Sequence, residues 1–292
     1  MNIFLTGSTG FLGLALAEKL IEQGHQVFGL VRANSSVEKK NKLKNLGATL
    51  ISSDSYIDTL SLYEIDCVVH TATNYGRNNP ILSEIFESNL ILPLQILKDI
   101  AKTGKNITFI NTDSSFNKDN YIYSPLIDYS LSKKSLLDWL IYFSNQLPIV
   151  NMRIELMYGP NDGVDRFISS IIKKLLDPQT QKINLSPGLQ IRDFIYISDV
   201  VDAFSLLIEN VTGERQHNFI EYQIGTGVGI TIKDLVQQIA TISESKAELI
   251  FGALNYRQNE IMSSVSDKSF QYEFNWEHKI SVAEGLSKII VK

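Results

Sequence analysis

The chain has 292 residues, of which 44% are hydrophobic and 20% are charged. This composition is that of a folded globular protein, and it excludes a chain that is mainly disordered. Asp and Glu (32) outnumber Lys and Arg (27), and the resulting net charge of −5 argues against general binding to a nucleic-acid backbone.

Short apolar runs rich in β-branched residues alternate with amphipathic stretches over the first half of the chain. Such alternation is typical of βαβ units, and it predicts an α/β fold built on a parallel sheet. The expected strands are Asn2–Thr6, Gln26–Val31, Ala48–Ile51, Asp66–His70, Ile107–Asn111 and Ile149–Ile154, and the expected helices are Phe11–Gln23, Val37–Leu46, Pro80–Lys102 and Ile127–Asn145. The alternation of apolar runs and amphipathic stretches becomes less regular after residue 155, which predicts a smaller mixed lobe in the remainder.

A glycine-rich turn follows the first expected strand and opens the first expected helix. Its sequence is Thr6-Gly7-Ser8-Thr9-Gly10-Phe11-Leu12-Gly13. Glycines let the backbone approach a pyrophosphate closely, and a helix N-terminus offers free N–H groups and a partial positive charge. The spacing Gly-x-x-Gly-x-x-Gly differs from the common dehydrogenase fingerprint, so a purely structural turn is the alternative. The position in the chain favours dinucleotide binding by the turn, and the residues expected to take part are Gly7, Thr9, Gly10, Phe11, Leu12 and Gly13.

The end of the second expected strand bears on the choice between NAD and NADP. An acid about 20 residues after the glycines would bind the ribose 2′-hydroxyl of NAD, whereas an arginine accepts the 2′-phosphate of NADP. Here Val31 is followed by Arg32-Ala33-Asn34-Ser35, and the first acid is Glu38. NADP(H) is therefore favoured with Arg32 as its 2′-phosphate contact, and NAD(H) with a solvated Arg32 is the alternative.

Tyr129 and Lys133 lie four residues apart at the start of an expected helix, which places them on one face. A free tyrosine titrates near 10, and a nearby cation favours its phenolate, so the pair suits proton exchange with a substrate hydroxyl. Thr112 lies just after the fifth expected strand, at the sheet edge where ligands of open α/β sheets bind. We therefore expect Thr112, Tyr129 and Lys133 to be catalytic.

Together these motifs resemble the extended short-chain dehydrogenase/reductases, in the NAD-dependent epimerase/dehydratase branch that acts on nucleotide sugars. The resemblance extends over essentially the whole chain. It implies a Rossmann-like, doubly wound parallel sheet that forms a dinucleotide-binding domain over residues 1–155, with a return segment near 198–225. It also implies a smaller C-terminal lobe over 156–292 that mainly binds substrate.

The resemblance implies further site residues. Those expected at the cofactor are Asp54 near the adenine, Thr71, Ala72 and Thr73 after the fourth strand, and Asn89. Those expected at the nucleotide-sugar substrate are Gln190 and Arg192 in the segment Leu185–Val200, and Arg257 and Glu260 in the segment Tyr256–Met262. A nucleoside diphosphate entering an acidic protein needs guanidinium groups, which supports the two arginines. A structural ion pair, such as one between Arg192 and Asp193, is the alternative.

Departures from the family narrow the reaction. Sugar 4,6-dehydratases of the branch carry Thr-Asp-Glu after the fifth strand, where this chain has Thr112-Asp113-Ser114. The carboxylate that acts as base is therefore missing, which disfavours dehydration. Asp113 is expected either to contact the substrate as a proton donor or to cap local backbone.

Within the branch, the motifs resemble the CDP-abequose and CDP-paratose synthase type of 4-reductase, which serves deoxysugar biosynthesis for the O-antigen of lipopolysaccharide. The resemblance implies NADPH-dependent reduction of the C4 ketone of a CDP-4-keto-3,6-dideoxyhexose. Two alternatives remain open: a nucleotide-sugar epimerase with tightly bound NAD, and a dinucleotide-sensing protein without catalysis. The tyrosine–lysine pair argues against the sensor.

The remaining features concern compartment and partners. One cysteine cannot form an internal disulfide, and four scattered histidines show no metal-ligand spacing, so neither a disulfide nor a structural metal is expected. The sequence shows no signal peptide and no apolar run long enough to cross a membrane, which predicts a cytoplasmic protein. By resemblance, the helices near 80–102 and 127–145 are expected to form a homodimer interface.

Overall fold

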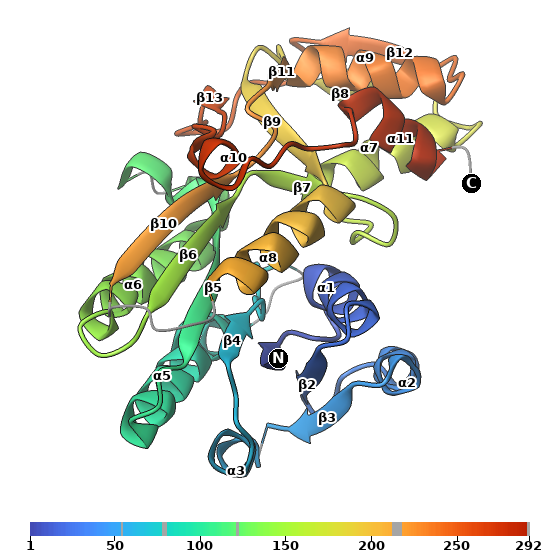
Figure 1. Cartoon of the computed structure of the whole chain (residues 1–292). Coiled ribbons are helices and arrows are strands. Elements are labelled where there is room, and N and C mark those ends of the chain that lie inside the picture. The colour runs from blue at the N-terminus through green and yellow to red at the C-terminus, as the bar shows by residue number, and fades with distance from the viewer. Residues whose placement is uncertain (54, 78–80, 121–122, 212–217, 291–292) are drawn as a thin grey trace. The chain divides into compact units, whose positions relative to one another are not determined.

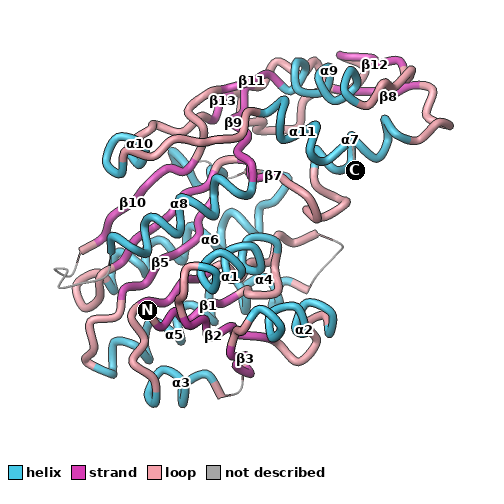
Figure 2. The backbone as a smooth tube through the Cα atoms, turned by 45° about the vertical axis from the view of Figure 1, so that its right-hand side comes forward, coloured by secondary structure: helices cyan, strands magenta, loops and turns pink. Residues whose placement is uncertain are grey.

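The computed structural model describes residues 1–53, 55–77, 81–120, 123–211 and 218–290. The chain divides into two compact units. The first contains Met1–Ile122, Leu126–Arg153 and Val201–Tyr222, and the second contains Tyr123–Pro125, Ile154–Val200 and Gln223–Lys292. Along the first half of the chain, strands and helices alternate (Figure 2).

A seven-stranded parallel sheet in the order β10-β6-β5-β4-β1-β2-β3 is the centre of the first unit (Figure 1). Its strands are β1 (Asn2–Thr6), β2 (Gln26–Val31), β3 (Thr49–Ser52), β4 (Cys67–His70), β5 (Thr108–Ser114), β6 (Ile149–Ile154) and β10 (Phe219–Ile224). This confirms the Rossmann-like doubly wound fold. The strand order reverses between β1 and β4, and the crevice at such a switch point is where ligands of these sheets bind.

Helices cover the sheet on both faces because alternate strand residues point to opposite sides. They are α1 (Phe11–Glu22), α2 (Val37–Leu46), α3 (Tyr56–Leu62), α4 (Leu82–Phe86), α5 (Leu92–Thr103), α6 (Ile127–Phe143) and α8 (Ile197–Val211). On one face, Phe4 and Phe109 pack in a buried cluster with Leu97 of α5 and Leu136 of α6. The C-terminal part of α8 is joined to α1 through a hydrogen bond from Ser205 Oγ to Gln23 Oε1 at 2.7 Å and through the Lys19–Asp202 ion pair.

The helix expected over Pro80–Lys102 is interrupted. A π-helical segment at Glu87–Ile91 separates α4 from α5, and Pro80 lies outside the described residues. Asn89, in that segment, is buried and turned toward the loop after β4. Single π-turns within α-helices are common at functional sites. The short helix α3 was not expected from the sequence.

Strand β5 is three residues longer at its end than expected. Asn111 and Asp113 lie two residues apart and so on the same face of the strand. Asn111 Nδ2 donates to Asn151 Oδ1 of β6 at 2.7 Å, and Asn151 Nδ2 donates to Asp113 Oδ2 at 3.0 Å. These side-chain hydrogen bonds join β5 and β6 beyond the apolar part of β5. Thr112 therefore lies inside the strand and not after it.

The second unit is a smaller α/β lobe with two sheets. Strand β9 (Ile191–Tyr196) is central in a four-stranded sheet with β7 (Leu156–Tyr158), β11 (Gly229–Thr231) and β13 (Ser263–Ser264), and β8 (Lys182–Leu185) pairs with β12 (Glu248–Phe251). Its helices are α7 (Phe167–Leu176), α9 (Ile232–Ile242), α10 (Ser269–Phe274) and α11 (Val282–Ile290). In the described part of the chain, no helix combines the length and apolarity that a membrane span needs.

Candidate active site

The glycine turn packs tightly against the end of β4. Gly7 has a φ of +67°, and a Cβ at this position would lie 2.5 Å from the backbone nitrogen of Ala72. A Cβ on Gly13 would overlap the carbonyl oxygen of Gly7. Gly10 N donates to Gly7 O at 2.7 Å, and Ser8 Oγ donates to Leu30 O on β2 at 2.9 Å. The glycines at 7 and 13 are therefore required by the turn itself, which is held between β2 and β4.

The N-terminus of α1 is chemically available, and the residues present fit a pyrophosphate. Gly10 is the N-cap and supplies no side-chain hydrogen bond. By contrast, Ser36 caps α2 and Thr231 caps α9 by accepting a backbone N–H. The first N–H groups of α1 therefore receive no side-chain acceptor from the N-cap residue, and an anion is the complement that such a helix end binds well.

The loop after β4 is held by hydrogen bonds to Thr6 and to Asn89. Thr71 Oγ1 donates to Thr6 O at 2.8 Å, and Ala72 N donates to Thr6 Oγ1 at 3.3 Å. Asn89 Oδ1 accepts from Asn74 N at 2.7 Å and from Thr73 Oγ1 at 3.3 Å. The amide nitrogen of Asn89 donates to Asn74 O at 2.8 Å and to Ser132 Oγ of α6 at 3.0 Å. Asn89 thus uses all of its hydrogen-bonding capacity on protein groups, and its part in cofactor binding would be to fix this loop against the helix of Tyr129.

Two cofactor residues are expected after β2, namely Arg32 and Asp54. Arg32 is exposed at the carboxyl end of β2, and its backbone N–H donates to Ser35 Oγ at 3.1 Å. Lys40 of α2 reaches the same turn, where its Nζ donates to Ala33 O at 3.3 Å. Asp54, expected near the adenine, lies outside the described residues. Two cationic side chains therefore lie at the turn of residues 32–35: Arg32 belongs to the turn, and Lys40 reaches it from α2.

The structure brings the three expected catalytic residues together at the carboxyl end of β5 and the start of α6. Tyr129 and Lys133 are both buried on α6, and Lys133 Nζ donates to the carbonyl oxygen of Thr112 at 2.7 Å. The Thr112 hydroxyl is buried and has no hydrogen-bond partner among the described residues. A hydroxyl, a phenol and an ammonium are the groups that can hold and protonate a substrate oxygen, and the Lys133–Thr112 contact joins the helix of the pair to the end of β5.

Burial perturbs the charged groups around Lys133. Desolvation lowers the pKa of the Lys133 ammonium to about 8, and the charge of Asp113 opposes this shift. Desolvation also lowers the pKa of His70 well below its usual value, and the Lys133 charge adds to the effect. His70 is therefore a neutral imidazole, and its Nδ1 lies 2.8 Å from Thr6 Oγ1.

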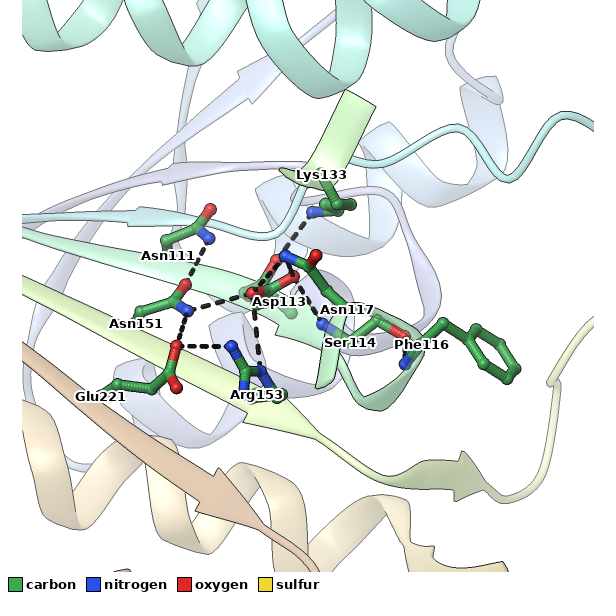
Figure 3. A network of polar contacts seen from close by, with 10 residues as sticks. Asn111, Asp113, Ser114, Phe116, Asn117, Lys133, Asn151, Arg153 and Glu221 are labelled. Atoms are coloured by element: carbon green, nitrogen blue, oxygen red, sulfur yellow. Dashed lines mark hydrogen bonds and ion pairs between the residues drawn. The ribbon is translucent and has the colours of Figure 1, made fainter. Parts of the chain in front are cut away.

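Asp113 belongs to a buried polar network that joins β5, β6 and β10 (Figure 3). Its carboxylate accepts hydrogen bonds from Ser114 N at 2.8 Å, Asn117 Nδ2 at 3.1 Å and Asn151 Nδ2 at 3.0 Å. Arg153 Nε lies 3.9 Å from the same carboxylate, and Arg153 Nη2 donates to Glu221 at 2.8 Å. Of the two expectations for Asp113, these contacts favour the local structural role over contact with substrate.

In the second unit, Arg192 is buried and forms an ion pair with Glu260. Its Nη2 donates to Glu260 Oε1 at 2.7 Å, and its Nη1 donates to Ile191 O at 2.8 Å. The ion pair that the sequence suggested with Asp193 does not form. Asp193 instead accepts hydrogen bonds at the turn after β10 and at the end of β13, from the backbone N–H groups of Thr226, Gly227 and Ser266 and the hydroxyls of Thr226 and Ser266. Asp193 therefore organises the lobe.

The other expected substrate residues differ in availability. Arg257 is exposed, and its Nη1 donates to the Tyr123 hydroxyl at 3.1 Å. Gln190 is buried, and its Oε1 has no hydrogen-bond partner among the described residues. Tyr256 accepts the backbone N–H of Leu189 at 3.2 Å, which links the two motif segments within the lobe. Within the described part of the chain, this exposed guanidinium has one donor engaged, and its remaining N–H groups can bind an anion.

Sequence reasoning missed one side chain beside Tyr129, the expected catalytic tyrosine. The Tyr75 ring stacks on Tyr129, with the ring centroids 4.8 Å apart and the planes inclined by 20°. The Arg77 guanidinium lies over the Tyr75 ring, 6.0 Å from its centroid. An aromatic residue a few positions after the fourth strand was the available signal, but nothing local showed which ring it would meet. The network partners Asn151 and Glu221 were missed for the same reason.

The fold and the site define an extended short-chain dehydrogenase/reductase, an enzyme that works with NAD or NADP. A model of the NAD dependent epimerase/dehydratase family matches residues 3–225, which is more than half of the chain. The chain belongs to this family, as the sequence resemblance predicted.

Individual relatives extend over nearly the full length. The CDP-abequose synthase of Salmonella typhimurium is 32% identical over 99% of this chain and 97% of its own. Among solved structures, the UDP-glucose 4-epimerase of Thermotoga maritima with UDP-glucose has a TM-score of 0.81 at 24% identity, covering 100% of this chain and 98% of its own. The UDP-glucuronic acid 4-epimerase of Bacillus cereus, in complex with UDP-glucuronic acid and NAD, has a TM-score of 0.82 at 21% identity over 100% and 98% of the two chains.

Proposed function

We propose that this enzyme reduces the C4 ketone of a nucleotide-activated deoxyhexose with NADPH, with a CDP-4-keto-3,6-dideoxyhexose as substrate. One observation carries the proposal: the set Thr112, Tyr129 and Lys133 is assembled, whereas the carboxylates for eliminating water are not available. Ser114 stands where the base would be, and Asp113 is bound by protein groups on several sides. The similarity to a CDP-abequose synthase supports the same reaction class.

The roles of the residues follow from their chemistry. A dinucleotide held at the glycine turn would supply the hydride that the C4 carbon receives. The Tyr129 hydroxyl then donates a proton to the C4 oxygen, and the Thr112 hydroxyl, which has no partner among the described residues, hydrogen-bonds that oxygen. Lys133 stabilises the phenolate that Tyr129 becomes, because a nearby cation favours the charged form.

NADP(H) is proposed over NAD(H) because of the turn after β2. Arg32 is exposed there, Lys40 lies against the Ala33 carbonyl, and no acid stands between Val31 and Glu38 to repel a 2′-phosphate. In the substrate lobe, Arg257 is proposed to contact the diphosphate directly. Arg192, with Glu260 and Gln190, is proposed to shape the same binding surface, since Arg192 already pairs with Glu260.

The test is a reduction assay with purified protein, NADPH and a CDP-4-keto-3,6-dideoxyhexose. The expected result is loss of NADPH absorbance with roughly one NADPH consumed per product, since one hydride is transferred. Protein denatured before the assay should release little dinucleotide, because a net reductase exchanges its cofactor in each turnover.

Two other outcomes would replace the proposal. Interconversion of two hydroxy-sugar nucleotides without added NADPH, with NAD released on denaturation, would identify an epimerase. Dinucleotide binding without reaction on CDP-, dTDP- and UDP-linked sugars would indicate a dinucleotide-sensing protein.

A homodimer is also proposed, through the helix of the catalytic pair. The outer face of α6 exposes Leu131, Trp139, Ile141 and Tyr142, an apolar set larger than an isolated surface residue. Light scattering after gel filtration should give twice the chain mass, and Trp139→Lys should shift it to the monomer. A monomeric native protein would refute this part of the proposal.

A further inference from the structure

We propose that Asp113 is a positioning residue for Lys133: a buried carboxylate that keeps the catalytic ammonium charged and aims it at the end of β5. The proposal rests on the role given above to Lys133, and it assigns Asp113 no contact with substrate. It departs from the reading of Asp113 as a proton donor.

The Asp113 carboxylate is surrounded by hydrogen-bond donors. Ser114 offers a backbone N–H, Asn117 an amide nitrogen and Arg153 a guanidinium, and all of these are donors. The orientation of the Asn151 amide is fixed independently, because its nitrogen faces both Asp113 and Glu221 while its oxygen accepts from Asn111 Nδ2. Each of these partners therefore directs a donor at an Asp113 oxygen, and the network is complementary to two acceptor oxygens at this position.

Hydrogen bonds to protein groups, rather than burial alone, remove Asp113 from direct chemistry. Its side chain is 1% exposed, and the protein groups around it occupy its acceptor directions. A proton donor must reach the substrate oxygen within hydrogen-bond distance, directly or through one water. The Asp113 carboxylate instead faces Asn117, Asn151 and Arg153, all within its own unit.

The carboxylate acts on Lys133 in two ways. Through Ser114 N and Asn117 it holds the turn that ends β5, and the neighbouring Thr112 carbonyl accepts the Lys133 ammonium at 2.7 Å. Through its charge it offsets the desolvation of Lys133. The charges alternate from Lys133 to Asp113, Arg153 and Glu221, with Arg153 beside both carboxylates (Figure 3).

The other groups near Lys133 do not replace this anion. Burial, and then the charge of Lys133, lowers the pKa of His70 on the neighbouring strand β4, so His70 offers no negative charge to Lys133. Tyr129 of α6 lies one helical turn away, and Asp113 of β5 is the group that raises the Lys133 pKa. Removing the Asp113 charge therefore leaves a buried ammonium with weaker compensation, and part of the enzyme carries neutral Lys133 at neutral pH.

The test compares Asp113→Asn, which keeps the shape, with Glu221→Gln and Asn117→Ala. NADPH affinity is measured by fluorescence across the pH range around the Lys133 pKa of about 8, and turnover is measured over the same range. Wild-type protein should lose affinity and turnover as pH rises through that value, because Lys133 loses its proton. In Asp113→Asn this loss should begin about 1–2 pH units lower, so that acid restores function.

The two other variants show whether the shift of the pH midpoint depends on charge. Glu221→Gln removes the more distant anion and should shift the midpoint in the same direction by less. Asn117→Ala removes a hydrogen bond but keeps the Asp113 charge, so it should lower stability without moving the midpoint. If Asp113→Asn does not fold, the contrast between Glu221→Gln and Asn117→Ala still decides the question.

Several results would overturn the inference. A folded Asp113→Asn with an unmoved midpoint, or with a loss of turnover that is equal at every pH, would show that Asp113 acts as a proton donor or only as structural support. A wild-type protein that binds NADPH but reduces no keto sugar would refute the proposed function, and the pH dependence of binding would still test the role of Asp113.

Discussion

Asn89→Ala is expected to weaken both the fold and cofactor binding, because Asn89 ties the loop after β4 to α6. The substitution leaves Asn74 N and Asn74 O without their present partners and removes the link to Ser132 Oγ. An unsatisfied buried group costs about 1–3 kcal/mol, and two such groups give about 2–4 kcal/mol, since Asn74 is partly exposed to water. Ser132 keeps its bond to the Tyr129 carbonyl and adds little.

Urea unfolding followed by circular dichroism measures this free energy, and an NADPH fluorescence titration measures the effect on the loop. The matched control is Gln95→Ala on α5, which removes an exposed amide from the adjoining helix and should change stability by less than about 0.5 kcal/mol. Asn89→Asp should fall between the two, because it keeps the acceptor for Asn74 N and loses the donors. If Asn89→Ala and Gln95→Ala unfold alike, the loop does not depend on Asn89.

Three further predictions follow from the site. Tyr129→Phe should lower turnover by roughly 10²–10⁴ with little change in NADPH affinity, and near-normal turnover in a stopped assay would exclude Tyr129 as proton donor. Arg32→Asp should weaken NADPH by about 1.5–3 kcal/mol more than NADH in parallel titrations, and equal losses would contradict the 2′-phosphate contact. Glu260→Gln should destabilise the protein by about 2–3 kcal/mol in urea unfolding, because it leaves buried Arg192 without its charged partner, whereas an unchanged midpoint would mean the pair contributes nothing.

Local periodicity predicted the sheet well. The expected strands Asn2–Thr6, Gln26–Val31 and Ile149–Ile154 match β1, β2 and β6 to the residue, because each is an apolar run bounded by polar or turn residues. The π-turn at Glu87–Ile91 escaped prediction, since its cause is the inward side chain of Asn89 and its partners lie 15 and 43 residues away in sequence. The extension of β5 has a similar non-local cause in Asn151.

The motifs of the candidate site could be found from sequence, but the partners of their residues could not. Arg192 and Asp193 are adjacent and opposite in charge, which suggested a local pair, yet β-strand neighbours point to opposite faces. Arg192 consequently meets Glu260, 68 residues further on, and Asp193 meets Thr226 and Ser266. Which donors surround a carboxylate depends on strand order and register, and a motif contains neither.

The motif residues fall into two groups, according to whether other protein groups already occupy their hydrogen-bonding atoms. Substitutions in the two groups should differ in their effects on stability and on turnover. Asn89, Asp113 and Asp193 engage their polar atoms with other protein groups, so replacing them costs folding free energy before it affects chemistry. The Thr112 hydroxyl is buried without a partner among the described residues, and Arg32 is exposed, so both retain donors for a ligand. Substitutions in the second group should therefore change turnover or affinity at nearly constant stability. A buried hydroxyl without a partner is costly to keep, and under the proposed function a substrate oxygen would complete the hydrogen bond that Thr112 lacks in the free enzyme.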